Sequence, residues 1–248
     1  MCGVCGCGDD PVQARHAFVF GSQTARRVQV ELDILSKNNR FAADNRQQFT
    51  EQGVLVLNLV SSPGSGKTTV LTETIARLQT EMSIAVIEGD QQTRLDADRI
   101  QATGVEAIQI NTGKGCHLEA ERVGQAWQDL RQYQPSLLLI ENVGNLVCPA
   151  GFDLGEAHKV VILSVTEGED KPLKYPDMFH AASLMILNKI DLLPYLDFDV
   201  ERCIAYARQV NPAIQVFQLS ARSGAGFEDW LGWIKDQHSR RFLGRQAV

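Results

Sequence analysis

The chain has 248 residues, of which 44% are hydrophobic and 22% charged, as in ordinary folded domains. This length is enough for one α/β domain with a substantial core. The formal net charge of −6 argues against nucleic acid as the main partner, because phosphate backbones are bound by concentrated basic surfaces. No apolar run reaches membrane-spanning length, and the first residues lack the basic-then-apolar layout of a secretion signal. We therefore expect a cytoplasmic protein that binds neither nucleic acid nor membrane.

The first ten residues contain three of the six cysteines, Cys2, Cys5 and Cys7. This segment, residues 1–10, has no hydrophobic periodicity, and we interpret it as a metal-binding tail. Three thiolates joined by a backbone or terminal nitrogen suit a square-planar ion such as Ni²⁺ better than tetrahedral Zn²⁺. A redox pair or an unstructured tail remains an alternative. In a reducing compartment we expect the cysteines to be thiols or metal ligands rather than disulfides.

Residues 11–53 are predicted to form a helical N-terminal segment. An amphipathic helix over about residues 24–52 would pack on the domain that follows, with an interruption near Asn38-Asn39. The apolar residues that recur there at helical spacing are Val28, Leu32, Leu35 and Phe41.

From residue 54 onward, short apolar runs alternate with helical patterns. Near-continuous apolar strands separated by helices indicate an α/β fold, a mostly parallel sheet with helices on both faces. Ligands of such sheets bind beyond the carboxyl ends of the strands, so we expect the functional residues of this domain, residues 54–248, in the loops after the strands. The apolar runs are residues 54–60, 84–87, 107–110, 137–140, 160–165, 184–187 and 214–219.

A glycine-rich segment, residues 61–69 with the sequence Ser-Ser-Pro-Gly-Ser-Gly-Lys-Thr-Thr, lies between the first apolar run and a helical pattern. A strand before and a helix after are the context of a phosphate-binding loop. Its backbone N–H groups would surround the β-phosphate, Lys67 would contact the β- and γ-phosphates, and the Thr68 hydroxyl would hold Mg²⁺. The usual first glycine is replaced by Ser61. The nucleotide-binding residues predicted here are Gly64, Ser65, Gly66, Lys67, Thr68 and Thr69.

Two later segments indicate which base is bound. Asn-Lys-Ile-Asp at residues 188–191 directly follows an apolar run, and a carboxylate at Asp191 can accept from both the N1–H and the amine of guanine. Ser-Ala-Arg at residues 220–222 ends the last run and fits a loop whose backbone meets the guanine O6. Both segments, in this order after a phosphate loop, predict binding of GTP and GDP. The predicted base-binding residues are Asn188, Lys189, Asp191, Ser220, Ala221 and Arg222.

Acidic residues end two other predicted strands. Glu88-Gly89-Asp90 ends the second run and Glu141 ends the run of residues 137–140. Carboxylates there can hold Mg²⁺, directly or through water, or orient the attacking water. For Glu141, direct ligation and a role limited to hydrogen bonding are both open. We predict Mg²⁺ on Thr68 and Asp90, and the catalytic set is Lys67, Thr68, Asp90 and Glu141.

Two more cysteines and a histidine extend loops that follow predicted strands. Cys116-His117 comes after a glycine-rich segment and Cys148 comes seven residues after Glu141. Thiolate and imidazole together suit Zn²⁺, Ni²⁺ or copper ions, and water or a second copy of the chain would complete a four-coordinate shell. Buried structural thiols beside an unrelated histidine are the alternative. Cys203 lies in a helical pattern and is interpreted as a small buried hydrophobic residue.

Together these residues resemble the HypB family, the hydrogenase maturation GTPases that help to insert nickel into nickel–iron hydrogenase. The similarity covers essentially the whole chain. Gly-Lys-Gly-Cys-His and Glu-Asn-Val-Gly-Asn-Leu-Val-Cys-Pro are specific to this group, and the family tolerates serine at position 61. The matching stretches are residues 1–8, 61–69, 111–118, 141–149, 166–169 and 188–191.

The resemblance implies a SIMIBI-like P-loop GTPase domain, a GTP-dependent homodimer and two metal sites. One is the N-terminal cysteine site for nickel. The other, at Cys116, His117 and Cys148, is shared across the dimer and holds zinc or nickel. The implied partners are the small zinc-containing nickel accessory protein HypA and the hydrogenase large-subunit precursor. Some members carry a His-rich nickel-storage segment near the N-terminus, and this chain does not, which argues against bulk storage.

Three other functions fit parts of the sequence. A urease accessory GTPase typically has Cys-Pro-His as its metal motif, whereas Pro149 is followed here by Ala150. A metal-storage protein that uses nucleotide structurally is disfavoured by the intact Lys67, Thr68 and Asp90. A P-loop kinase is disfavoured because nothing resembles a phosphate-acceptor site. The sequence identifies no arginine that must stabilise the transition state of phosphoryl transfer. We therefore expect slow hydrolysis, in which the lifetime of bound GTP sets how long a conformational switch stays in one state.

Overall fold

The computed structural model describes residues 11–90 and 95–246. The predicted nickel tail with Cys2, Cys5 and Cys7 therefore lies outside the described residues. The chain forms two units, Met1–Lys37 and Asn38–Val248, and each is described by itself.

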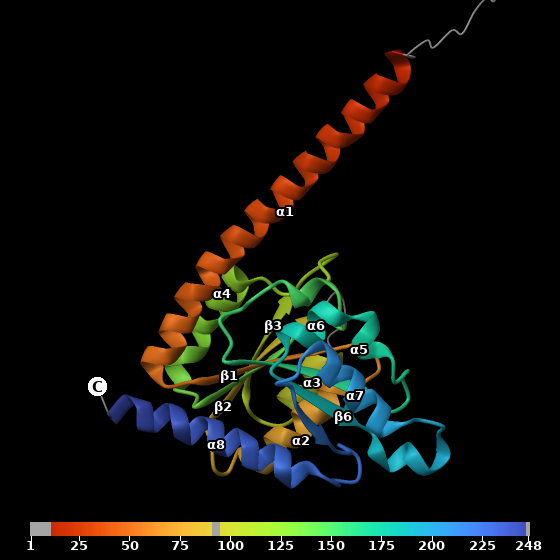
Figure 1. Ribbon diagram of the computed structural model, residues 1–248. Helices are drawn as coiled ribbons and strands as arrows, with labels where there is room; N and C mark the ends of the chain where they lie inside the picture. Colours follow the sequence, from red (N-terminus) through yellow and green to blue (C-terminus); the bar gives the residue numbers. More distant parts are fainter. Residues whose placement is uncertain (1–10, 91–94, 247–248) are drawn as a thin grey trace, which may run out of the picture. The chain divides into compact units, whose positions relative to one another are not determined.

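Helix α1, Pro11–Gln52, begins in the first unit and ends in the second (Figure 1). It is continuous through Asn38-Asn39, so the predicted interruption is wrong. In isolated helices asparagine side chains compete with the backbone for hydrogen bonds. Here the side chain of Asn38 is bound elsewhere, because it accepts from the backbone N–H of Ala120 at 2.9 Å and donates to the carbonyl of Asp153 at 2.7 Å. These tertiary contacts explain why the helix continues.

The buried face of α1 in the second unit consists of Asn38, Ala42, Asn45 and Phe49. Their spacing of three and four residues is that of one helix face. Leu32, which the sequence analysis placed on the packing face, is 54% exposed in the first unit. The packing face of α1 was therefore assigned wrongly. The assignment relied on apolar residues, whereas two of the four buried residues of α1 in the second unit are polar.

The second unit is built on a seven-stranded sheet in the order β3-β2-β4-β1-β5-β6-β7, with every neighbouring pair parallel. Each strand overlaps one of the seven predicted apolar runs, and the near-continuous apolar character of those runs reflects burial on both faces. The strands are β1 Leu55–Ser61, β2 Ile84–Asp90, β3 Glu106–Asn111, β4 Leu137–Glu141, β5 His158–Ser164, β6 Leu184–Asn188 and β7 Gln215–Gln218.

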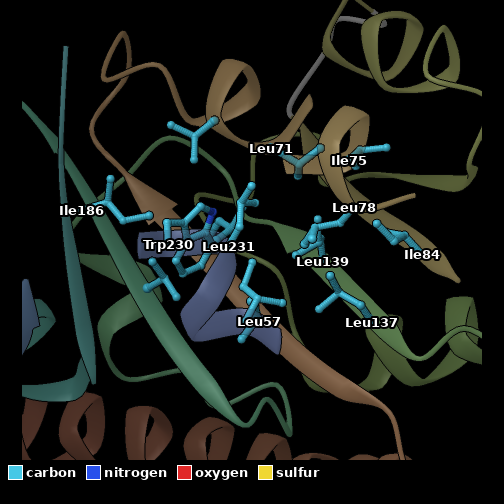
Figure 2. Close-up of a cluster of buried hydrophobic side chains, with 14 of the residues drawn as sticks. Leu57, Leu71, Ile75, Leu78, Ile84, Leu137, Leu139, Ile186, Trp230 and Leu231 are labelled. Atoms are coloured by element: carbon cyan, nitrogen blue, oxygen red, sulfur yellow. The ribbon is translucent and has the colours of Figure 1, made fainter. Parts of the chain in front are cut away.

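Helices cover both faces of the sheet, which confirms the predicted α/β class. One face packs on α2, α3 and α8 through a core that includes Leu57, Leu71, Leu139 and Trp230 (Figure 2). The other face packs on α4 with the end of α1, and on α6 with α7. The helices of this unit after α1 are α2 Lys67–Leu78, α3 Leu95–Gln101, α4 Ala120–Leu130, α5 Lys171–Lys174, α6 Pro176–Ala181, α7 Val200–Val210 and α8 Phe227–Gln246. Three short 3-10 helices are η1 Arg131–Tyr133, η2 Cys148–Ala150 and η3 Ile190–Tyr195.

The topology places the predicted functional loops at one edge of the sheet. β1 lies between β4 and β5, and β2 lies on the other side of β4. In this register Glu141 is opposite Glu88 on one side and Leu59 on the other. The carboxyl ends of β1, β2 and β4 therefore meet beside the phosphate loop. Within the described residues, no helix is long and apolar enough to cross a membrane.

Candidate nucleotide and metal site

The phosphate loop connects the end of β1 to the start of α2 at Lys67. Gly64 and Gly66 have φ angles of +80° and +90°, a region that favours glycine. A Cβ at Gly66 would also lie 2.6 Å from Nδ2 of Asn188, so the loop and the predicted base segment touch here. Ser65 Oγ donates to the carbonyl of Ser62 at 2.7 Å and lies 2.8 Å from Oε1 of Glu167.

Lys67, Thr68 and Glu141 form one buried cluster. The Lys67 ammonium lies 2.5 Å from Oε1 of Glu141, and the Thr68 hydroxyl donates to the same oxygen at 2.6 Å. The second oxygen, Oε2, is buried and has no hydrogen-bond partner within residues 11–90 and 95–246. An orphaned carboxylate oxygen beside a threonine hydroxyl is a donor set that suits Mg²⁺. Lys67, Thr68, Asp90 and Glu141 all line one cavity of about 570 Å³.

Glu88 is a member of this cluster that the predicted site did not include. It is 2% exposed, and its Oε2 is buried without a hydrogen-bond partner among the residues that the structure describes. Burial, then the charges of Glu141 and Asp90, raise its pKa to about 7, although the charge of Lys67 opposes them. The period of two along a strand puts Glu88 on the same face of β2 as Asp90, and that signal was available in the sequence.

The predicted base-binding residues meet in a second cavity of about 350 Å³. Asn188 donates from Nδ2 to the carbonyl of Ser65 at 2.9 Å and accepts at Oδ1 from the N–H of Ala221 at 3.2 Å. Asp191 accepts from the hydroxyl of Ser220 at 2.5 Å. The structure thus brings the two base segments together and joins them to the phosphate loop. The residues that line this cavity are Gly66, Thr69, Asn188, Lys189, Asp191, Leu192, Ser220, Ala221 and Arg222.

Cys116, His117 and Cys148 also come together, with their ligand atoms all within 4.8 Å of one another. The structure pairs the two sulfurs as a disulfide across a Cα–Cα distance of 6.1 Å, and the same two residues with His117 form a group that could hold a metal ion, so their role as metal ligands stays a prediction. When reduced, two thiolates this close can bind one ion. Cys203 is fully buried, and burial raises the pKa of its thiol to about 12.

The environment of His117 fits a metal ligand. Burial lowers the pKa of its imidazole, which outweighs the opposite effect of Glu119, and the neutral ring is the form that binds metal. Its Nδ1 lies 3.6 Å from Sγ of Cys116, and its Nε2 is buried with no hydrogen-bond partner from the described residues. The ring of Phe152 packs against it with centroids 3.7 Å apart. An orphaned imidazole nitrogen beside two sulfurs is a donor set that suits zinc or nickel.

Comparison with known proteins identifies the family. The profile described as CobW/HypB/UreG, nucleotide-binding domain, matches residues 55–218. Hydrogenase maturation factor HypB of Azotobacter chroococcum is 66% identical over 238 residues, covering 96% of this chain and 77% of that protein. The chain belongs to the HypB family. The HypB protein of Escherichia coli K12 is 63% identical over 217 residues, covering 88% of this chain and 75% of that protein.

Solved HypB structures share the fold. HypB from Archaeoglobus fulgidus is 38% identical with a TM-score of 0.77, covering 82% of this chain and 99% of that one. HypB from Helicobacter pylori, solved in complex with nickel, is 39% identical with a TM-score of 0.77, covering 82% of this chain and 96% of that one. The likeness extends at 14% identity to the signal recognition particle protein of Aeropyrum pernix, with a TM-score of 0.52, which shows the fold alone.

Proposed function

We propose that this HypB-family chain is a GTP-hydrolysing nickel metallochaperone that assists nickel insertion into nickel–iron hydrogenase. The observation that carries the proposal is that loops at the ends of one parallel sheet hold both the cavity lined by the predicted base-binding residues and the Cys116, His117 and Cys148 group. The names of the Azotobacter and E. coli relatives, and the nickel in the H. pylori HypB structure, support it.

The hydrolysis would use the buried cluster beside the phosphate loop. Lys67, which contacts Glu141 in this structure, would move its charge to the β- and γ-phosphates. Bound Mg²⁺ supplies charge neutralisation at the phosphates, and Thr68 and Asp90 would hold it. Glu141 would then be released to orient the attacking water or to contact the ion. Asp191 would select guanine, with Arg222 and Ala221 forming the facing wall. We expect slow turnover, so that the lifetime of bound GTP sets how long the GTP-bound conformation persists.

The metal cargo would be bound by Cys116, His117 and Cys148, as zinc or nickel. Three ligands leave a four-coordinate shell open, so water or a second protomer would complete it. A GTP-dependent homodimer that shares this site would make metal binding depend on protein concentration. HypA and the hydrogenase large-subunit precursor would be the protein partners, in the cytoplasm.

A separate nickel site would lie in the tail at Cys2, Cys5 and Cys7. Deleting residues 2–7 should remove one equivalent of bound Ni²⁺ and leave GTP turnover nearly intact. The measurement is equilibrium dialysis with Ni²⁺ alongside a phosphate-release assay. A loss of turnover as large as the loss of metal would show that the tail belongs to the GTPase machinery.

The function is tested by titrating the reduced full chain with Ni²⁺ and Zn²⁺, with and without GTP and Mg²⁺, while measuring phosphate release from GTP and ATP. We expect hydrolysis of GTP in preference to ATP, and metal binding that is reduced by Cys148→Ala. A matched control is Cys203→Ala, which removes a buried thiol of helix α7 that is not part of the metal-ligand group. Equal hydrolysis of both nucleotides, or metal binding that Cys148→Ala does not change, would contradict the proposal.

A further inference from the structure

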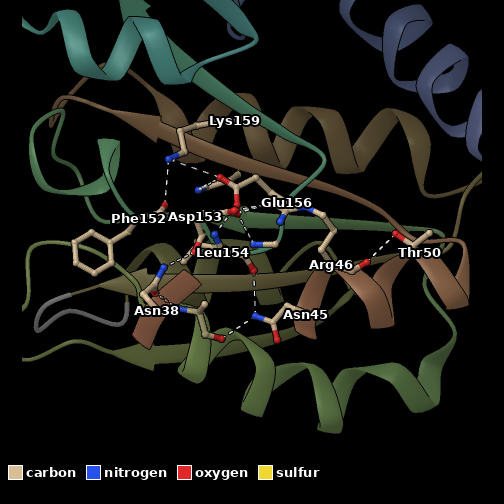
Figure 3. A network of polar contacts seen from close by, with 12 residues as sticks. Asn38, Asn45, Arg46, Thr50, Phe152, Asp153, Leu154, Glu156 and Lys159 are labelled. Carbon is tan, nitrogen blue, oxygen red and sulfur yellow. Dashed lines mark hydrogen bonds and ion pairs between the residues drawn. The ribbon is translucent and has the colours of Figure 1, made fainter. Parts of the chain in front are cut away.

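A buried lysine supports the segment that follows Cys148. Lys159 lies near the start of β5 and is 7% exposed, which is unusual for lysine. Its ammonium donates to three backbone carbonyls, those of Pro149 at 2.8 Å, Ala150 at 3.2 Å and Phe152 at 3.1 Å. Figure 3 shows the contact with Phe152. An ammonium has three N–H donors, so this side chain uses its full capacity on one short stretch of backbone.

The three carbonyls belong to residues that shape the metal site. Pro149 directly follows Cys148 in the short helix η2. Phe152, three residues further along, packs its ring on His117. Lys159 therefore fixes the backbone next to one sulfur ligand and the backbone that carries the ring on the imidazole, without contacting either ligand itself.

The charge of Lys159 is balanced by a buried carboxylate. Oε1 of Glu156 lies 3.8 Å from the ammonium, and the two side chains are 6% and 7% exposed. Glu156 also accepts from the N–H of Leu154 at 2.6 Å and from Nδ2 of Asn58 at 3.0 Å. Buried charges persist only when they are paired and hydrogen-bonded, and this pair meets both conditions.

The network continues from Asn58 to the other metal-bearing segment. Asn58 lies in the middle of β1, and its Oδ1 accepts from Nδ2 of Asn142 at 3.2 Å. Asn142 accepts at Oδ1 from the backbone N–H of Leu118 at 3.1 Å, and Leu118 directly follows His117. Asn142 is fully buried and directly follows Glu141. One chain of buried polar contacts thus joins both metal-bearing segments to the strand end beside the phosphate loop.

We propose that Lys159 and Asn142 are positioning residues of the metal site. Lys159 holds the segment of Cys148 and Phe152, and Asn142 holds the segment of Cys116 and His117 against the end of β4. The inference rests on the proposed function, because it concerns the same metal site.

Replacing Lys159 by methionine tests this role, because methionine has a similar length but no donors. Three buried carbonyls would lose their partner, and the segment would rearrange to recover hydrogen bonds. Loss of an outer partner that orients metal ligands typically lowers metal affinity roughly tenfold to a hundredfold. Lys159 lines neither the base cavity nor the cavity at the phosphate loop, so Lys159→Met should change nucleotide affinity less than about twofold. Asn142→Ala should weaken metal binding in the same direction.

The experiment uses the full chain with Cys2, Cys5 and Cys7 changed to serine, kept reduced, and titrated with Ni²⁺ against a competing chelator. Thiolate-to-nickel absorption reports the geometry of the site, and binding of a fluorescent GDP reports the fold. The matched control is Lys235→Met, because Lys235 is an exposed lysine paired with Glu81 at 2.7 Å. We expect Lys159→Met to lower nickel affinity and alter the absorption band, while Lys235→Met changes neither.

Unchanged nickel affinity and an unchanged band in Lys159→Met would overturn the inference and leave the proposed function standing. If the unsubstituted site binds neither Ni²⁺ nor Zn²⁺, the proposed metal function itself fails, and the inference fails with it. If Lys159→Met loses GDP binding, the same titration is made with Glu156→Gln/Lys159→Met, which removes both buried charges and leaves no isolated carboxylate. Lower nickel affinity with an altered absorption band would then support the inference, and unchanged affinity with an unchanged band would overturn it.

Discussion

The predicted base-binding side and the predicted cation-binding side of the sheet edge differ in whether their buried polar atoms have hydrogen-bond partners. On the base side, Asn188 bonds to Ser65 and Ala221, and Asp191 bonds to Ser220. On the cation side, buried atoms of Glu88, Glu141 and His117 have no hydrogen-bond partner in the described part of the chain. A buried polar group without a partner destabilises the folded state, so bound cations would stabilise this side more than the base side. The base side is shaped by contacts among its own motif residues.

The largest effect is expected from Lys67→Ala, which removes the cation that contacts Glu141. Loss of one preorganised charge on the transferred phosphoryl group costs roughly a hundredfold or more in rate. The measurement is single-turnover phosphate release, with Lys235→Ala as the control for loss of a lysine. Turnover within about twofold of the parent would contradict the role of Lys67.

Asp191→Asn tests the base side. The carboxamide presents a donor where xanthine carries a carbonyl, so the variant should bind xanthosine nucleotides better than the parent does. Loss of charge-assisted hydrogen bonds should weaken GTP binding about tenfold to a hundredfold, as measured by competition with fluorescent GDP. Unchanged GTP affinity would show that Asp191 does not select the base.

Glu88→Gln tests how much the buried charge of this carboxylate lowers the free energy of unfolding. The pKa of Glu88 is about 7 in the folded chain, above the unfolded value of about 4.3. The folded state therefore holds a proton that the unfolded state has lost, and ligand-free stability falls as the pH rises from about 4.3 to 7. Urea unfolding at pH 8 should find Glu88→Gln more stable by about 1–3 kcal/mol, and the difference should shrink toward pH 5. A pH-independent difference would contradict this explanation.

The comparison also explains what the sequence could predict. The strands and the phosphate and base loops were predicted correctly in position, because their signals are local: apolar runs, glycines and short motifs. Lys159, Asn58 and Asn142 were not predicted, because each is a single polar residue at or beside an apolar run, and its meaning depends on a partner far along the chain. Asn38 and Asn45 were missed for the same reason. Asn45, for example, donates to the carbonyls of Ala120 at 2.8 Å and Leu154 at 3.1 Å (Figure 3).

The contacts at the end of β4 suggest how the nucleotide acts on the metal. Glu141 contacts Lys67 and Thr68, and the next residue, Asn142, binds the backbone after His117. We propose that a γ-phosphate would draw Lys67 away and change the position of Glu141, and that the adjacent residue Asn142 would transmit this change to the metal site. By linkage, metal would then alter nucleotide affinity by the same factor.

The most direct test is the Ni²⁺ affinity of the reduced chain lacking Cys2, Cys5 and Cys7, measured with GDP and with a non-hydrolysable GTP analogue. We predict affinities that differ by about fivefold or more, and Cys148→Ala should abolish the difference while sparing nucleotide binding. Equal nickel affinities in the two nucleotide states would contradict the coupling and leave two independent sites.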